Sequence, residues 1–378
     1  MKYQGLVTAT FASVTIAGMA HAAGIERAGD RSQILFEEGK NYLEFSATVV
    51  SPYISGTPNA GAPPALPVIG PGGFPIGVAP TAGTGNITER YITGAAGFKH
   101  QLNDQVAIAF TIDEPVGADV NYRAPNAVFT GSEAQVDSVA YTAMAKYKVN
   151  DNVSVYGGLR LQSLKGDVTV IAASGFVPAG GFSYTLNVDN DYKLGYLLGA
   201  AYEKPEIAMR VALTYESAIT HDFRDNNGTE FDVEIPQAVT LHAQTGVAPD
   251  TLLFGSIKWR EWTKFNIAPP DFVAQTGNPI AFEPDDSWTY ELGLGHRFND
   301  IWSGAVLLGY ETEHDATVGN LQGKDGYISY GLAATYETES WEITTGVKYF
   351  DVGDAETSVS SFSGNDAIAF GMKLGFRF

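Results

Sequence analysis

Apolar and polar side chains alternate along the segment from Asp366 to Phe378, which ends the sequence. Successive side chains of a β-strand point to opposite faces, so the alternation predicts a strand with one apolar and one charged face. The apolar set is Ile368, Phe370, Met372, Leu374, Phe376 and Phe378, and the charged set is Asp366, Lys373 and Arg377. Such a strand fits the wall of a membrane barrel, where lipid-facing and lumen-facing residues alternate.

Two kinds of connection divide the rest of the chain. Short polar turns occur at residues 102–106, 149–153, 204–206, 248–250, 298–302 and 337–339. Their Asn and Asp residues tolerate the left-handed backbone conformations that two-residue hairpins need. Longer connections rich in Gly, Pro and Asn lie at 56–86, 123–131, 172–181, 222–228, 264–282, 314–326 and 353–364. Short turns at one end and long loops at the other are typical of outer-membrane barrels.

The segments between these connections number about fourteen, the even count that a bacterial single-chain barrel requires. They lie near residues 42–55, 88–102, 105–122, 133–149, 152–168, 184–203, 207–221, 230–245, 250–263, 284–298, 301–313, 326–338, 341–352 and 365–378. We therefore predict an all-β protein, a transmembrane antiparallel β-barrel of about 14 strands over residues 42–378.

Composition excludes several other classes. A mean hydropathy of -0.05 and the lack of a long apolar run after residue 22 argue against a helical membrane protein. The absence of cysteine removes disulfide frameworks and thiolate metal sites. A soluble β-sandwich or propeller would show the same alternation. Against it stand the terminal Phe and the aromatic residues beside the short turns, which suit girdles at the membrane interfaces: Tyr147, Tyr202, Phe298, Tyr336 and Trp341.

The first residues have the form of an export signal. Lys2, the apolar stretch from Gly5 to Met19 and the sequence Ala20-His21-Ala22 predict a signal peptide over residues 1–22, with cleavage before Ala23. An uncleaved membrane anchor would need a longer apolar run. The net charge of -20 argues against a nucleic-acid partner. Acidic external loops that keep the chain soluble in transit explain this charge, and a cation-selective pore is the alternative.

No residue pattern indicates catalysis. The sequence lacks a Gly-x-Ser-x-Gly elbow, and the histidines after the predicted signal peptide are scattered without metal-ligand spacing, at His100, His221, His242, His296 and His314. The carboxylate pairs Glu37-Glu38 and Asp285-Asp286 suit solvated turns better than acid/base dyads. We therefore expect no enzyme activity, no metal and no cofactor.

Five short segments carry a family resemblance, which extends over nearly the whole mature chain. They are residues 23–27, 50–56, 112–122, 235–241 and 254–262, the last with the sequence Lys-Trp-Arg-Glu-Trp. They resemble the FadL-type long-chain fatty acid transporters, hydrophobic compound transporters of Gram-negative outer membranes. The resemblance implies a monomeric barrel of fourteen strands with a plug, or hatch, folded inside its lumen.

The resemblance also implies site residues. The plug would be the segment 23–41, with Ile25, Arg27, Arg31, Ile34, Leu35, Phe36 and Glu37 as its main residues. A kink in the third strand would open the wall sideways as a lateral gate, formed by Asp113, Glu114, Pro115, Val116, Gly117 and Ala118. The residues agree with the kink, because Pro115 has no N–H to donate and Gly117 no side chain to pack. A plain β-bulge at the barrel rim is the alternative.

The implied function is passive uptake, by lateral diffusion through the kink, of long-chain fatty acids or other hydrophobic small molecules. The apolar outer stretch from Ala60 to Val78 would catch the ligand. A general porin for polar solutes is the alternative, since charged lumen residues fit both. The plug is shorter than in larger family members and lacks their Asn-Pro-Ala element, which leaves the substrate class open.

The expected partners follow from the same resemblance. They are a fatty acid-like hydrophobic ligand, outer-membrane lipid and lipopolysaccharide, and the barrel assembly machinery. A terminal Phe after alternating apolar residues resembles the recognition signal of that machinery, here Phe370, Met372, Leu374, Phe376 and Phe378.

Overall fold

The computed structural model describes residues 25–59, 83–124, 129–172, 182–314, 317–319 and 321–378. The predicted signal peptide, the first two residues of the predicted plug and the stretch from Ala60 to Val78 lie outside these ranges. None of the helices in the described part of the chain is long and apolar enough to cross a membrane.

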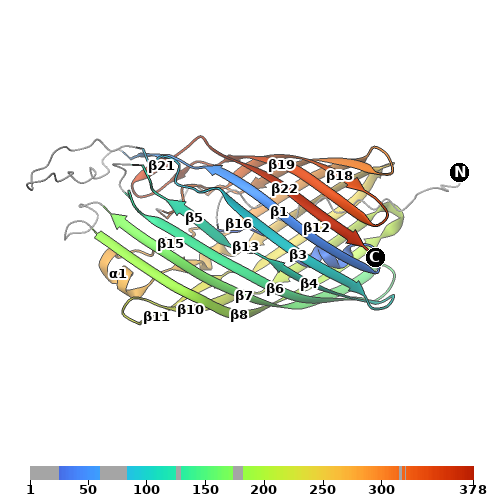
Figure 1. The fold of residues 1–378 in the computed structure, drawn as a ribbon, viewed down its shortest axis with the longest axis horizontal. Coiled ribbons are helices and arrows are strands. Elements are labelled where there is room, and N and C mark those ends of the chain that lie inside the picture. Colours follow the sequence, from blue (N-terminus) through green and yellow to red (C-terminus); the bar gives the residue numbers. More distant parts are fainter. Residues whose placement is uncertain (1–24, 60–82, 125–128, 173–181, 315–316, 320) are drawn as a thin grey trace, which may run out of the picture.

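The strands form one antiparallel sheet that closes on itself into a barrel (Figure 1). Its members are β1 (Asn41–Tyr53), β3 (Tyr91–Gln101), β4 (Val106–Asp113), β5 (Gly117–Asn121), β6 (Glu133–Lys148), β7 (Val153–Ala172), β8 (Phe182–Lys204), β9 (Met209–Glu216), β12 (Ala238–Ala248), β13 (Thr251–Arg260), β16 (Ser287–Arg297), β17 (Trp302–Glu311), β18 (Tyr327–Glu337), β19 (Trp341–Val352) and β22 (Asn365–Arg377). Because β4 and β5 occupy one position, the 15-stranded sheet makes a ring of fourteen. The predicted fold class is confirmed.

The ring closes where the last strand meets the first. β1 pairs with β22 from Tyr42 opposite Arg377 to Tyr53 opposite Asp366. Asn41 and Phe378 extend this ladder, since each donates its backbone N–H to the carbonyl of the other, at 3.0 and 3.2 Å. A closed ring leaves no open strand edge, which is what a sheet in lipid requires.

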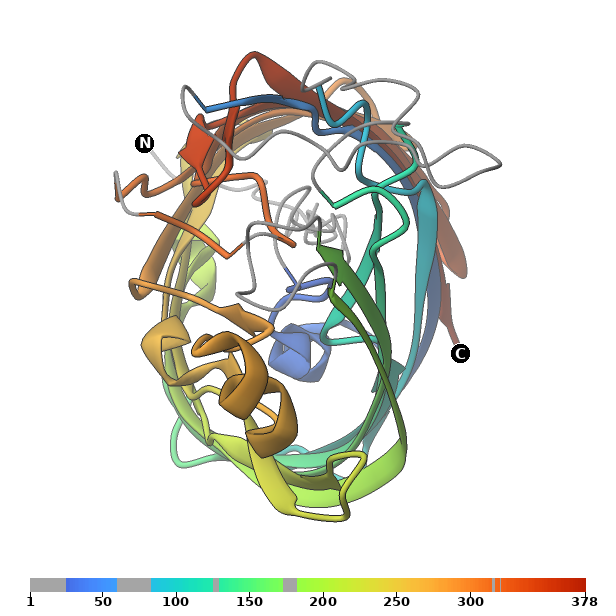
Figure 2. The same ribbon diagram turned by 90° about the vertical axis from the view of Figure 1, so that its left-hand side faces the viewer.

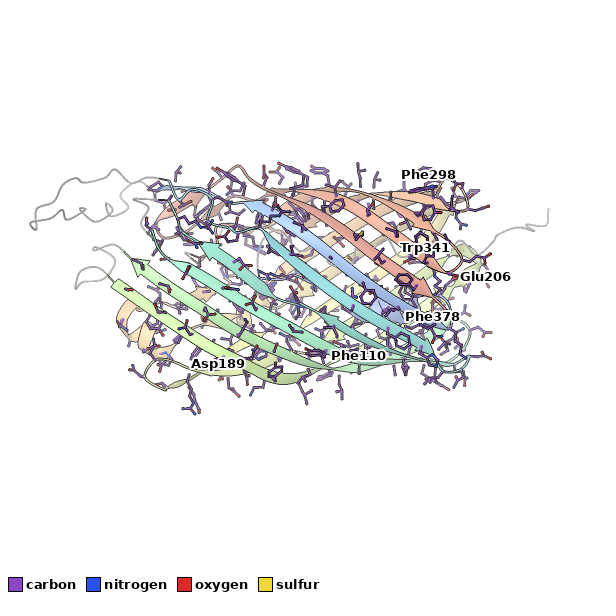
Figure 3. All side chains as sticks on the ribbon, in the orientation of Figure 1. Phe110, Asp189, Glu206, Phe298, Trp341 and Phe378 are labelled. Atoms are coloured by element: carbon purple, nitrogen blue, oxygen red, sulfur yellow. The ribbon has the colours of Figure 1, made fainter. Side chains whose placement is uncertain are left out.

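The outer surface of the barrel is apolar. On β22, Ile368, Phe370, Met372, Phe376 and Phe378 are 40 to 68% exposed, whereas Lys373 on the inner face is 1% exposed. The exposed aromatic residues Phe298, Trp341 and Phe378 lie toward the short-turn end (Figure 3). Tyr336 contacts Trp302 and Trp341 there, at ring-centroid distances of 5.0 and 5.2 Å. This arrangement suits an interfacial girdle.

Three short turns share one construction. Asn103, Asn150 and Asn299 each accept, through the side-chain oxygen, the backbone N–H groups two and three residues later. None of these Asn residues has a positive φ; among the described non-Gly residues, only Ala208 and Asp250 do. The turns lie where the sequence predicts them, but side-chain hydrogen bonds, rather than left-handed backbone, form these three.

The other end carries the long loops and the short elements. These are β2 (Gly56–Pro58), β10 (Ile219–Arg224), β11 (Glu230–Ile235), β14 (Asn266–Ile267), β15 (Ala281–Phe282), β20 (Ala355–Glu356), β21 (Ser360–Phe362), η3 (Trp262–Lys264) and α1 (Pro270–Thr276). The predicted strands 207–221 and 230–245 are each divided, the first before β10 and the second after β11. Pro236 follows β11 and has no N–H for a ladder. η2 (Pro205–Ile207) forms one of the predicted short turns.

The remaining helix, η1 (Arg31–Phe36), lies inside the barrel (Figure 2). Beside it, toward the short-turn end, is a small apolar cluster that includes Tyr42, Met144 and Tyr156. A larger apolar cluster fills the lumen toward the long loops, with Val136, Leu164 and Phe231 among its buried members. The described interior therefore holds two apolar clusters, a small one beside η1 and a larger one toward the long loops.

Candidate transport pathway

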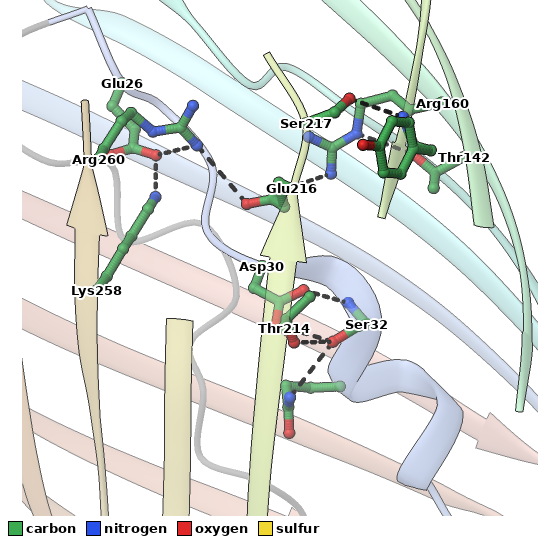
Figure 4. Close-up of polar contacts among 12 residues, drawn as sticks. Glu26, Asp30, Ser32, Thr142, Arg160, Thr214, Glu216, Ser217, Lys258 and Arg260 are labelled. Atoms are coloured by element: carbon green, nitrogen blue, oxygen red, sulfur yellow. Dashed lines mark hydrogen bonds and ion pairs between the residues drawn. The ribbon is translucent and has the colours of Figure 1, made fainter. Parts of the chain in front are cut away.

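Residues 25–40 form an inner segment that is held against the barrel wall. Asp30 caps η1 by accepting a 2.8 Å hydrogen bond from the Ser32 backbone N–H, and its carboxylate also accepts one of 2.8 Å from Thr214 on β9 (Figure 4). His242 on β12 lies 3.4 Å away. Burial by itself would raise the pKa of Asp30, but His242 and these hydrogen bonds hold it well below its usual range. The start of η1 is thereby tied to two strands.

The apolar part of the inner segment packs toward the short-turn end of the lumen. Ile34 and Leu35 are 4% and 0% exposed within the small apolar cluster. Phe36 contacts the Tyr156 ring edge to face, at a centroid distance of 5.6 Å. The cations of Lys146 and Arg210 lie over the Phe36 ring, at 4.2 and 4.6 Å. A ring held this way gains both apolar and cation–π stabilisation.

The charged residues of the inner segment pair with charges on the strands. Arg27 contacts Asp119 at 2.5 Å, Arg31 contacts Glu44 at 2.5 Å, and Glu37 lies 3.9 Å from Lys373. Sequence reasoning missed Glu26, which pairs with Lys258 and Arg260 on β13 (Figure 4). Ile25, the first described residue, lines two pockets. The predicted plug residues that the structure describes thus all lie in the lumen.

The third strand of the ring is broken between Asp113 and Gly117, and both halves pair with β6. Asp113 lies opposite Ala140 and Gly117 opposite Asp137. Three residues therefore span a stretch that β6 spans with two. Ser138 fills the break, because its hydroxyl accepts the Val116 N–H at 3.0 Å and donates to the Val116 carbonyl at 2.5 Å. On this side the break is a one-residue bulge.

On its other side the broken strand has no continuous partner. β3 pairs with β4 only from Ala95 onward, and no ladder joins β3 to β5 in the described part of the chain. Pairing resumes nearer the long loops, where Glu89 donates its N–H to the Asp119 carbonyl at 3.2 Å. By the register of Ala95 with Asp113 and of Thr88 with Val120, residues 91–94 lie opposite residues 114–117, without backbone–backbone hydrogen bonds between them. We call this stretch the β3–β5 seam.

The inner segment takes the place of the missing ladder. The Gly117 N–H donates to the Ile25 carbonyl at 2.7 Å, and the Arg27 N–H donates to the Pro115 carbonyl at 2.9 Å. Glu26 and Val116 form the isolated bridge between these bonds. Two backbone groups of the broken strand, the Gly117 N–H and the Pro115 carbonyl, are therefore paired from inside the barrel, where lipid could not pair them.

An apolar pocket lies beside the seam, on the β6 side. It encloses about 460 Å³ of space, open solvent included. Its lining is apolar except for Lys165 and comprises Ile25, Val136, Leu164, Lys165, Gly166, Val168, Leu186, Val188, Phe223, Phe231, Val233, Ile235, Phe265 and Ile267. Because Val136 pairs with Ala118 of β5 and Ile25 holds Gly117, the pocket adjoins the predicted kink.

A second pocket, of about 550 Å³ with open solvent included, is polar and shares Ile25 with the first. Glu283, Glu311 and Asp325 line it together with Lys324 and His314. Burial raises the pKa of Glu283 to about 7. The described residues contain no group of three or more His, Asp or Glu side chains arranged to hold a metal ion.

The remaining predicted residues lie apart from this region. Phe370, Met372, Leu374, Phe376 and Phe378 follow one face of β22, on the outside of the barrel. Sequence reasoning also missed Tyr91, Asp119 and the whole lining of the apolar pocket. The pocket lining comes from several strands and from residue 25, so no local pattern announces it.

Comparison with known proteins identifies similar structures and a family. No curated protein sequence matches it. Among solved structures, a Pseudomonas aeruginosa FadL homologue matches with a TM-score of 0.75 and 14% identity, over 96% of each chain. The Pseudomonas putida toluene transporter TodX matches at 0.62 and 10% identity, over 96% of each chain. The Ralstonia pickettii toluene transporter TbuX matches at 0.61 and 14% identity, over 96% of this chain and 97% of the other.

These structural similarities show a shared fold, and a family model shows the family. Residues 36–360 match the model described as outer membrane protein transport protein (OMPP1/FadL/TodX). The match agrees with the closed barrel and its apolar outer face. The chain therefore belongs to the OMPP1/FadL/TodX family of outer membrane transport proteins and is an outer-membrane β-barrel, as the sequence predicted.

Proposed function

We propose that the protein takes up hydrophobic small molecules, long-chain fatty acids among them, by passive lateral diffusion. A ligand enters between the outer loops, occupies the apolar pocket and leaves through the β3–β5 seam into the bilayer. The supporting observation is that an apolar pocket adjoins the β3–β5 seam, where neighbouring strands of the ring lose their ladder. Two relatives are named toluene transporters, which adds aromatic hydrocarbons to the candidate ligands.

The other half of the lumen supports this route. The inner segment blocks the short-turn end through Phe36, Leu35 and the ion pairs of Arg31 and Glu37. An apolar molecule would have to cross this charged region to reach the periplasm, which is unfavourable without compensation. A sideways exit into lipid avoids that cost. The comparisons give no support to the alternative of a general porin.

A single deletion tests the exit. Deleting Pro115 removes the extra residue opposite β6, so the third strand becomes continuous while Val116 and Gly117 keep their faces. The matched control is Pro115→Ala, which keeps the extra residue. Both variants are expressed in cells that lack their own transporter, and uptake of labelled oleate and of labelled toluene is measured alongside the amount of folded barrel.

We expect the deletion variant to lose uptake while Pro115→Ala retains most of it. Equal uptake by folded protein of both variants would refute the lateral exit. Planar-bilayer recording gives an independent check, since a large and steady conductance would support a porin instead.

A further inference from the structure

Arg27 joins the two sides of the β3–β5 seam through its side chain. The guanidinium lies over the Tyr91 ring of β3, 4.5 Å from its centroid. The same group contacts the Asp119 carboxylate of β5 at 2.5 Å. Arg27 is 5% exposed, so both contacts form largely away from water, where cation–π and ionic interactions are strong.

Gly117 provides the space that this side chain occupies. A Cβ atom built on Gly117 would overlap the Arg27 guanidinium and nothing else among its nearest neighbours. The guanidinium thus rests directly on the backbone of the broken strand, at the point where the ladder to β3 is missing. A residue with a side chain at position 117 would push Arg27 out of the seam.

The closing group belongs to the inner segment and not to the wall. Every β-ladder of the ring can remain intact when Arg27 moves, because Arg27 is attached to the wall only through the Pro115 carbonyl and its side-chain contacts. The Nε atom of Arg27 is buried without a hydrogen-bond partner, which lowers the cost of leaving. Two residues earlier, Ile25 lines the apolar pocket.

We propose that Arg27 is the movable closing side chain of the β3–β5 seam, and that the wall opens when its guanidinium leaves Gly117. The inference deepens the proposed function, on which it rests for the identity of what passes. In this proposal the Arg27 side chain moves, while the break in the third strand keeps its backbone conformation.

Thiol labelling tests the proposal without any transported ligand. The chain contains no cysteine, so Thr93→Cys gives a single reporter on β3 within the seam, at a position that is 4% exposed. The reporter protein in lipid vesicles is treated with a lipid-soluble fluorescent maleimide. Arg27→Ala is compared with Arg31→Ala, a matched control that is also 5% exposed and also pairs with a strand carboxylate at 2.5 Å, but away from the seam.

We expect labelling in the Arg27→Ala background to be about tenfold faster than in the parent reporter or the Arg31→Ala background, because local opening follows the contacts that hold a segment closed. Gly117→Ala should have the same effect by displacing the guanidinium. Adding Gly117→Ala to Arg27→Ala should then change nothing further, because the two substitutions act through one group.

Equal labelling in the two arginine variants would overturn the proposal, as would additive effects of Arg27→Ala and Gly117→Ala. If labelling behaves as expected but neither oleate nor toluene enters cells, the closing role of Arg27 stands and the proposed cargo is wrong. If Arg27→Ala fails to fold, Gly117→Ala alone tests the proposal. Labelling of the Gly117→Ala protein that is no faster than labelling of the parent reporter would then refute the closing role of Arg27.

Discussion

Replacing Glu342 with Gln removes the carboxylate at the centre of a buried charge network near the short-turn end. Glu342 accepts hydrogen bonds from the Tyr42 hydroxyl at 2.9 Å and contacts Lys373 at 3.0 Å and Arg377 at 2.5 Å. Glu342 and Lys373 are each 1% exposed. In the variant, Lys373 loses the negative charge of Glu342 and keeps those of Glu37, at 3.9 Å, and Glu44.

Leaving one member of a buried ion pair uncompensated costs about 3 to 5 kcal/mol. Because Glu37 offsets part of the Lys373 charge, we expect the lower end, about 3 kcal/mol, or more than a hundredfold in the unfolding equilibrium. Urea unfolding of the barrel in detergent, followed by tryptophan fluorescence, measures it. The matched control is Glu230→Gln. Glu230 pairs with Arg224, the two side chains are 71% and 65% exposed, and the pair should contribute under about 1 kcal/mol to the free energy of unfolding.

Removing the unpaired Lys373 charge should restore part of the lost stability. The double variant Glu342→Gln with Lys373→Met should be more stable than Glu342→Gln alone, because the cost arises from the unpaired cation. Two results would refute the account: a Glu342→Gln protein no less stable than the Glu230→Gln protein, or a double variant weaker than the single one.

Three other outcomes are expected. Gly353→Ala should lower the free energy of unfolding by about 2 kcal/mol or more, because the added Cβ would overlap the Asp325 carbonyl, whereas Gly29→Ala meets nothing within 4 Å and should be near neutral in the same urea titration. Burial raises the pKa of Glu283 from its ordinary 4.5 to about 7. The contribution of this group to stability is therefore complete below pH 4.5 and is lost as the pH rises through 7. The difference between the urea midpoints at pH 5 and pH 8 should be smaller for Glu283→Gln than for the unchanged protein. Phe378→Ala keeps the main-chain bonds to Asn41 but should reduce the amount of folded barrel recovered from outer membranes, as judged by heat-modifiable migration.

The strands could be predicted because their signals are local. Apolar and polar residues alternate with a period of two along each strand. A lipid-facing surface selects apolar residues such as Phe370 and Met372 at every second position, just as a buried core does in a soluble sheet. The division of the predicted strand 230–245 was missed, although Pro236 cannot donate to a ladder. The construction of the turns could not be predicted, because Asn103 can either adopt a left-handed backbone or bond to later N–H groups, and its neighbours do not decide between them.

The candidate site depends on contacts between residues far apart in the sequence. Glu26 and Lys258 are separated by 232 residues, and Arg27 and Asp119 by 92. Which carboxylate faces which cation follows from the register of strands around the ring, and a single sequence carries no direct record of that register. The break at Pro115 was predicted, but that β3, and not β6, is the neighbour that loses its pairing there was not.

The pairing of Asn41 with Phe378 joins residues 337 positions apart, and it bears on how the protein reaches its folded state. No arc of thirteen strands can hydrogen-bond both of its borders, so until β22 is in place β1 and β19 each present a row of free amide and carbonyl groups. Contacts of such long sequence separation form slowly, and exposed borders recruit other chains in the meantime. Ring closure therefore competes with intermolecular sheet growth during folding. A protein that covers the free edge of β1 until β22 pairs with it would raise the yield of folded barrel.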